Sequence, residues 1–155
     1  MRGPYRVRAR LREGRDQLDD RGSGAGALIL FALVFMTLAA FVIDGGLLIS
    51  QRERAADIAE QAARYAAQDI DKESLYDGSG GGAPINFANC DARVREFVRE
   101  TGMSIPDASA SGCVSADAQR VEVEIQLTYE PVLAGVLYGG SMTVRGRSVA
   151  ESVAG

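Results

Sequence analysis

The sequence predicts an α+β protein in which one long N-terminal helix packs on a small antiparallel sheet. Three stretches lead to this prediction. Residues 25–43 form an uncharged apolar run, residues 51–68 place small apolar side chains three and four positions apart, and residues 121–129 alternate strictly between apolar and polar side chains. The first two patterns are typical of helices, and the third is typical of a strand with one buried face.

The apolar run is long enough to cross a membrane. It holds nineteen residues, and its only polar member is Thr37. About 20 helical residues cross the hydrocarbon core of a bilayer. A secretory signal peptide is the main alternative, but its apolar stretch is shorter, at about 7–15 residues. We therefore expect residues 24–49 to form a transmembrane helix in the lipid bilayer of the cell membrane.

The charges on the two sides of the run predict its orientation. Seven arginines and four acidic residues precede it, whereas ten basic and seventeen acidic residues follow it. The positive-inside rule then predicts a single-pass protein with a basic cytoplasmic leader, residues 1–23, and an extracytoplasmic C-terminal domain. The leader has no sustained periodicity, so we expect it to be mostly disordered. We assign its charge to the membrane surface and expect no nucleic-acid partner.

Asp44 is the first charged residue after the run. A carboxylate inside the bilayer is costly unless it is paired or solvated. We favour the interpretation that Asp44 marks the outer membrane boundary, where water reaches it. The alternative is that Asp44 meets an arginine or a helix N-terminus of a neighbouring subunit.

Residues 50–76 are expected to continue the anchor as an extracytoplasmic amphipathic helix. Small side chains at helical spacing predict a packing face, because alanine lets another backbone approach closely. This face consists of Ala55, Ala56, Ala59, Ala62, Ala63 and Ala66.

A glycine-rich loop over residues 77–90 is expected to lead into a small α+β domain, residues 91–155. The domain should begin with a helix from Asp91, a candidate N-cap, to Thr101, ended by Gly102. A polar loop around Pro106 should follow.

Two strands, residues 121–129 and 141–152, are expected to pair. An apolar turn or short helix over residues 131–138 should join them. Residues 145–147 are a candidate bulge, and Cys113 could start a further strand.

Cys90 and Cys113 both fall on the expected outer side of the membrane. Outside the cytoplasm such a pair more often forms a disulfide than a metal site, and free buried thiols are the other alternative. A disulfide would stabilise the domain by about 3 kcal/mol on the chain-entropy model.

No arrangement of residues predicts catalysis. The chain has no histidine, so it lacks an imidazole base, and a zinc site would need four thiolates or carboxylates. Glu122 and Glu124 share one strand face, but carboxylates on an exposed face are usually solvated. We expect no enzymatic activity, no cofactor and no metal site.

Several short motifs carry a resemblance to a known family. Its residues are Arg21-Gly22-Ser23, Asp44-Gly45-Gly46-Leu47, Ala55-Ala56-Asp57-Ile58-Ala59 and the terminal strand pair. This pattern resembles the TadE/TadG-like proteins, pilin-like components of the bacterial tight-adherence pilus system. The resemblance implies a pilin-like fold and a pseudopilin-like role beside other pilus or secretion-system subunits, with homo- or hetero-oligomers formed through the N-terminal helix.

Prepilin processing in such systems implies a cut between Gly22 and Ser23, with glutamate as the fifth mature residue. That position holds Ala27. The departure argues against cleavage and favours a minor or accessory component over a major filament subunit. The alternative function is a membrane-anchored extracytoplasmic binding module that recognises a cell-envelope ligand through residues 77–117.

Overall fold

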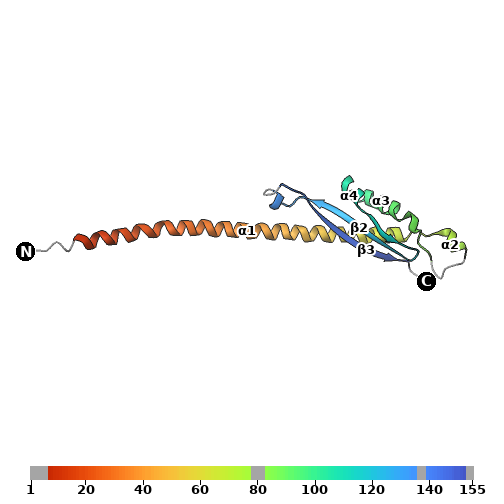
Figure 1. Cartoon of the computed structure of the whole chain (residues 1–155), viewed down its shortest axis with the longest axis horizontal. Helices are drawn as coiled ribbons and strands as arrows, with labels where there is room; N and C mark the ends of the chain where they lie inside the picture. The colour runs from red at the N-terminus through yellow and green to blue at the C-terminus, as the bar shows by residue number, and fades with distance from the viewer. Residues whose placement is uncertain (1–6, 78–82, 136–138, 153–155) are drawn as a thin grey trace, which may run out of the picture. The chain divides into compact units, whose positions relative to one another are not determined.

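The α+β class is confirmed in the computed structural model, which describes residues 7–77, 83–135 and 139–152. The start of the leader, most of the glycine-rich loop and the end of the apolar connection lie outside these ranges. The chain divides into two compact units, residues 1–42 and residues 43–155. The elements in chain order are α1 (Val7–Ala67), α2 (Lys72–Tyr76), η2 (Phe87–Asn89), α3 (Cys90–Glu100), α4 (Ile105–Ala110), β1 (Gly112–Ala116), β2 (Arg120–Tyr129) and β3 (Met142–Glu151) (Figure 1).

Helix α1 differs from expectation at both ends. It begins at Val7, so the expectation of a mostly disordered leader is wrong for the described part. Residues with high helix propensity, such as the arginines and leucines, can extend a helix that has already formed, because adding a turn avoids the cost of starting a new helix. It ends at Ala67 and does not continue to residue 76. Ile70 pairs instead with Ile85 in an antiparallel bridge, and the Asp71 side chain caps the separate helix α2.

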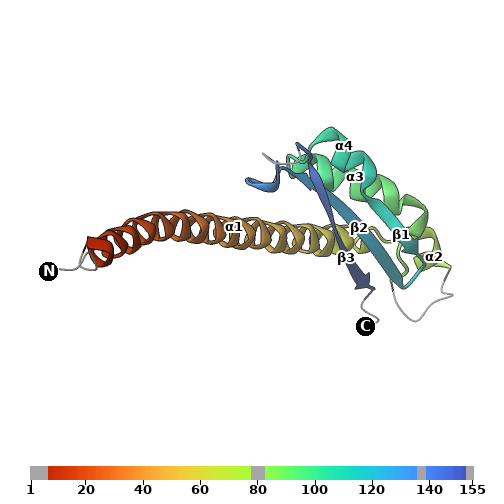
Figure 2. The ribbon, with the colours of Figure 1, turned by 60° about the vertical axis from the view of Figure 1, so that its left-hand side comes forward.

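The sheet has the order β1-β2-β3, and both pairs are antiparallel (Figure 2). The further strand expected from Cys113 is therefore present as β1. The register of β2 with β3 is regular from Arg120–Glu151 to Tyr129–Met142. The expected bulge over residues 145–147 is wrong, and the register shift lies in β1, between Cys113 and Ser115.

The apolar face of β2 forms the centre of the core. Val121, Val123 and Ile125 are fully buried, and they share one cluster with the alanines of α1 and with valines of α3. Burying each such side chain contributes about 1.5–3 kcal/mol. Helix α3 lies beside α1, since the rings of Tyr65 and Phe97 are 5.6 Å apart. The strict alternation of β2 is thus explained by a sheet covered on one face.

Gly146 allows β3 to approach the backbone of α1. It pairs with Ile125 in the sheet, and both face α1. A Cβ atom at this position would lie 2.6 Å from the carbonyl oxygen of Ala55 and closer still to the Ala56 nitrogen. This contact, and not a bulge, explains the glycine between two arginines.

The segment between α3 and β1 also differs from expectation. Asp91 does not cap α3, which begins at Cys90; its carboxylate accepts a hydrogen bond from the Cys113 N–H at 3.0 Å. The polar loop expected around Pro106 is helix α4, capped by the Ser104 hydroxyl. Gly102 ends α3 as expected, with a φ of 72°.

Asp107 joins α4 to β2 although it is a buried carboxylate. Its side chain accepts hydrogen bonds from the Ser104 hydroxyl at 2.8 Å, and from the Thr128 N–H and hydroxyl at 3.1 and 2.6 Å. Burial raises the pKa of Asp107, but the bonds from Thr128 and Ser104 outweigh it and hold the pKa below the ordinary value.

We expect Asp107→Asn to lower the free energy of unfolding by about 2 kcal/mol at pH 7, because a charged acceptor is lost. Because the pKa of Asp107 is lowered by folding, this stabilisation is complete above about pH 4, the ordinary pKa of an aspartate in an unfolded chain. It is lost as the pH falls through the pKa of Asp107 in the folded protein. The variant should therefore lose less stability than the wild type on acidification. Thermal unfolding followed by circular dichroism between neutral and acid pH tests this. Glu130→Gln, at an exposed position, is the control; equal acid sensitivity of Asp107→Asn and wild type would contradict the prediction.

Candidate functional site: the apolar segment and the Asp44 junction

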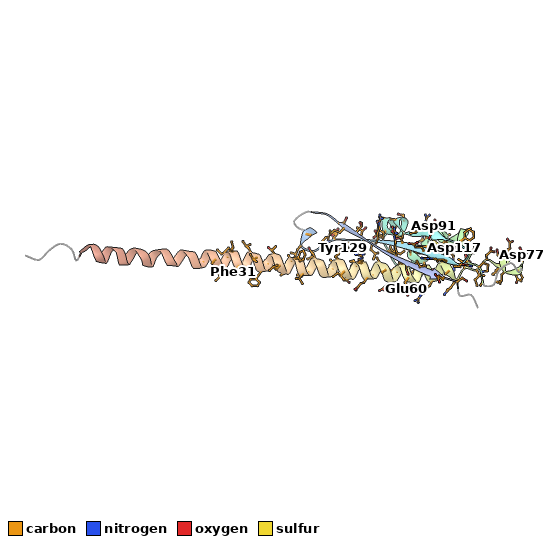
Figure 3. All side chains as sticks on the ribbon, turned by 60° about the horizontal axis from the view of Figure 1, so that its bottom comes forward. Phe31, Glu60, Asp77, Asp91, Asp117 and Tyr129 are labelled. Carbon is orange, nitrogen blue, oxygen red and sulfur yellow. A yellow bond between two sulfur atoms is a disulfide. The ribbon has the colours of Figure 1, made fainter. Side chains whose placement is uncertain are left out.

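The apolar run in α1 leaves its side chains unpartnered. From Leu28 to Ile43 the large apolar side chains are between 48% and 80% exposed, and Phe31 projects freely from the helix (Figure 3). The helix is long and apolar enough to cross a membrane. A contiguous apolar surface of this size marks contact with lipid or with another protein.

Glycines leave open positions along the same helix. A Cβ at Gly24, Gly26, Gly45 or Gly46 would have no atom within 4 Å apart from the adjacent residues and the backbone of its own helical turn. Small residues in membrane helices let a neighbouring helix approach closely. The Gly22–Ser23 bond lies inside α1, and the expectation that it is not cleaved stays a prediction.

Asp44 binds the connection between β2 and β3. Its carboxylate accepts hydrogen bonds from three successive backbone N–H groups, those of Val132 at 3.0 Å, Leu133 at 3.2 Å and Ala134 at 2.7 Å. These groups open a helical turn, and unpaired N–H groups at such a position favour a carboxylate. The sequence analysis considered a helix N-terminus of a neighbouring subunit as a partner for Asp44. In the structure the N–H groups of such a turn come from the same chain.

Replacing Asp44 with alanine is expected to release residues 131–135, because three N–H groups lose their acceptor. Amide hydrogen exchange, measured by mass spectrometry, should accelerate in this segment and stay unchanged in β2. Asp44→Asn keeps a single acceptor oxygen and should give an intermediate effect. Asp57→Ala, which removes an exposed carboxylate from the same helix, is the control, and equal protection of residues 131–135 in all three variants would count against the cap.

The disulfide between Cys90 and Cys113 is present. It connects the first residue of α3 to β1, and the two Cα atoms are 6.2 Å apart. Cys90 is buried in the core, so the bridge links the core to the edge strand β1. The sequence left open a disulfide, a metal site or free buried thiols, and the structure has the disulfide.

The polar face of the sheet holds ion pairs. Glu124 binds Arg147 at 2.5 Å and Arg145 at 3.5 Å, and Glu122 accepts from the Ser115 hydroxyl. The hydrogen bond that Arg147 donates to Glu124, followed by the negative charge of Glu124, raises the pKa of Arg147. The two glutamates therefore accept hydrogen bonds from different side chains.

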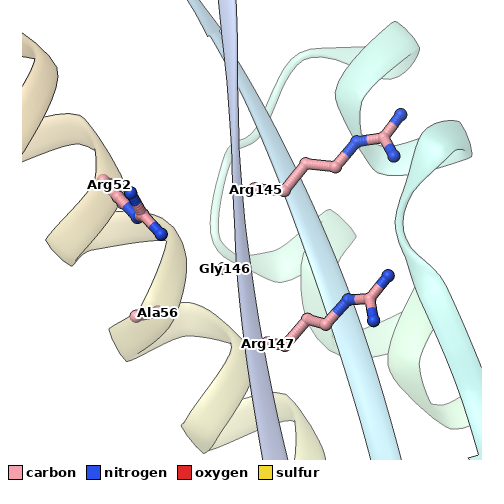
Figure 4. Close-up of a pocket in the computed structure, with 5 residues that line it drawn as sticks. All are labelled: Arg52, Ala56, Arg145, Gly146 and Arg147. Carbon is pink, nitrogen blue, oxygen red and sulfur yellow. The ribbon is translucent and has the colours of Figure 1, made fainter.

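A shallow groove lies where β3 crosses α1, lined by Arg52, Ala56, Arg145, Gly146 and Arg147. Arg145 and Arg147 project from β3 away from α1, on which Arg52 stands (Figure 4). The three guanidinium groups thus do not converge on one point. Among the described residues, no three His, Cys, Asp or Glu side chains are grouped so that they could hold a metal ion.

Residues 22–69 match a family model described as Tad, putative Flp pilus-assembly TadE/G-like. This segment is therefore similar to TadE/G-like proteins. The match confirms the resemblance found in the sequence, and the description names pilus assembly as the process. No curated protein and no solved structure gave a significant match to the chain.

The TadE/G-like segment contains the apolar run, Asp44 and the whole alanine face of α1. Five of the six predicted alanines are buried against the chain's own sheet and α3, whereas Ala56 is exposed and lines the groove beside β3. The residues that sequence reasoning missed are Gly146 and Asp107. Ser104 three positions before Asp107, with Pro106 between them, is a helix-start signal that could have revealed α4.

Residues 77–117, considered above as a recognition loop, are largely ordered secondary structure in their described part. They contain η2, α3, α4 and β1. The described part of this range is therefore built mainly of helices and one strand, and not of a long loop.

Proposed function

We propose that this protein is a non-enzymatic, pseudopilin-like minor component of a tight-adherence pilus or a related secretion apparatus. The observation that carries the proposal is the extent of the TadE/G-like match. It covers both the exposed apolar run and Asp44, whose carboxylate binds the backbone of residues 132–134.

The proposed topology is a single membrane pass with residues 1–23 in the cytoplasm and the α+β domain outside it. The excess of arginine before the apolar run supports this orientation. The disulfide between Cys90 and Cys113 also supports it, because disulfides persist in oxidising compartments.

The proposed assembly surface is residues 24–43 of α1 and not its alanine face. The alanines are already covered within the chain, whereas the apolar side chains and the positions beside Gly24 and Gly26 are open. Lipid and the membrane helices of other pilus subunits, including a second copy, are the partners that fit such a surface. Ala27, in place of glutamate, supports a minor component that keeps its leader.

Deletion of the chain from its native cell is the primary test. We expect loss of pili and of adhesion, restored by the wild-type chain and not by Gly26→Leu, which would block close helix approach. Leu30→Ile is the matched control in the same run and should restore both. Unchanged piliation after deletion would refute the proposal, and a mature chain beginning at Ser23 in mass spectrometry would overturn retention of the leader.

A further inference from the structure

We propose that the β2–β3 connection is a second membrane-contacting element, in which residues 131–135 rest in the interface of the bilayer that α1 crosses. The inference rests on the membrane anchor of the proposed function. It adds a contact that the anchor alone does not require, because a single helix suffices to hold a protein in a membrane.

The depth of the β2–β3 connection in the bilayer follows from two links: Asp44 is covalently joined to the apolar run, and its carboxylate is hydrogen-bonded to the connection. Ile43 is the last residue of the apolar run, and Asp44 follows it directly. Nineteen helical residues cover most of the hydrocarbon thickness, at about 1.5 Å per residue. The Asp44 carboxylate therefore stands at the boundary between hydrocarbon and headgroups. The N–H groups of residues 132–134 lie within 3.2 Å of it, so their turn shares that depth whatever the tilt of the helix.

The connection presents apolar surface where a strand connection is ordinarily polar. Residues 131–144 contain no charged residue, whereas turns between strands are usually rich in polar side chains. Val132 is 57% exposed and Met142, at the start of β3, is 48% exposed. On α1, Leu48 and Ile49 are also exposed within two turns of Asp44.

A bilayer interface fits this surface better than water or a protein partner does. Apolar side chains beside a polar backbone cap are typical of elements that lie in the interface, where acyl chains and headgroups meet. The Asp44 cap leaves the three N–H groups satisfied without water, which removes the cost of placing this backbone beside lipid. A second copy of the chain is the competing occupant.

Tryptophan fluorescence tests the contact directly, because the chain has no tryptophan of its own. The full-length protein is reconstituted in vesicles with brominated phospholipids, which quench tryptophan on contact. Val132→Trp and Met142→Trp probe the connection, Phe35→Trp probes the anchor, and Val149→Trp, at a comparably exposed site on β3, is the water-facing control. We expect blue-shifted emission and strong quenching of both connection variants by bromines near the headgroups, with little change in the control.

The outcomes separate the inference from the proposed function. Quenching of Phe35→Trp without quenching of either connection variant would overturn the lipid contact and leave the anchor standing. Absence of quenching in Phe35→Trp would remove the anchor, and with it both proposals. Quenching that appears only when the protein is diluted in excess lipid would show that a second copy covers the connection, which would also overturn the inference.

Discussion

Gly146→Ala is expected to lower the free energy of unfolding by at least about 3 kcal/mol, near the upper end of overpacking effects. The added Cβ would stand 2.6 Å from the carbonyl oxygen of Ala55 and nearer to the backbone atoms beside it. A flexible side chain could rotate away, but a helix backbone cannot. Relief therefore requires β3 and α1 to separate, which would open the core around Ile125.

The measurement is chemical unfolding of the full-length chain in detergent, followed by near-ultraviolet circular dichroism. Gly140→Ala is the matched control, because no atom beyond its adjacent residues lies within 4 Å of its Cβ position and its φ is not positive. It should change the free energy by less than about 0.5 kcal/mol. Similar stabilities for the two variants would show that the close approach of β3 and α1 is not needed.

Removal of the Cys90–Cys113 disulfide is the second large effect, expected at about 3 kcal/mol. The bridge closes a loop with a sequence separation of 23 and so restricts the unfolded chain. Cys90→Ala with Cys113→Ala removes it without burying a hydroxyl in the core. We expect the pair of substitutions to lower the unfolding midpoint by the same amount as reduction of the wild type.

Reduction supplies the control for this prediction. A reductant should destabilise the wild type and leave the double variant unchanged. Alkylation before reduction should label neither cysteine of the wild type. Labelling of both thiols, or equal stability of the oxidised wild type and the double variant, would contradict the role of the bridge.

Local patterns predicted most of the elements of the fold. The alternation over residues 121–129 marked β2 because side chains of a strand point in turn to opposite faces. The alanines of α1 recur three and four positions apart, which is the spacing of residues on one face of a helix, so they marked its buried face. Gly102 ended α3 as expected because glycine adopts a positive φ without strain.

Other features depended on partners distant in sequence. Asp107 lies in a segment that looked like a polar loop, yet Thr128, twenty-one residues later, binds its carboxylate and holds α4 against β2. Gly146 was interpreted as part of a bulge. Its contact with the backbone of Ala55 is set by the packing of helix on sheet, and no sequence pattern reveals such a contact.

By itself the sequence determined the apolar run, the amphipathic continuation of its helix, the alternating strand and the TadE/G-like motifs, because each depends on short-range periodicity or spacing. Only the tertiary structure decided that the alanine face is covered by the chain's own sheet. It alone decided that Asp44 caps residues 132–134, eighty-eight to ninety positions away. The physical reason is that burial and hydrogen bonding are satisfied by whichever groups the folded chain brings together, and a linear pattern shows which groups need a partner but not which partner they find.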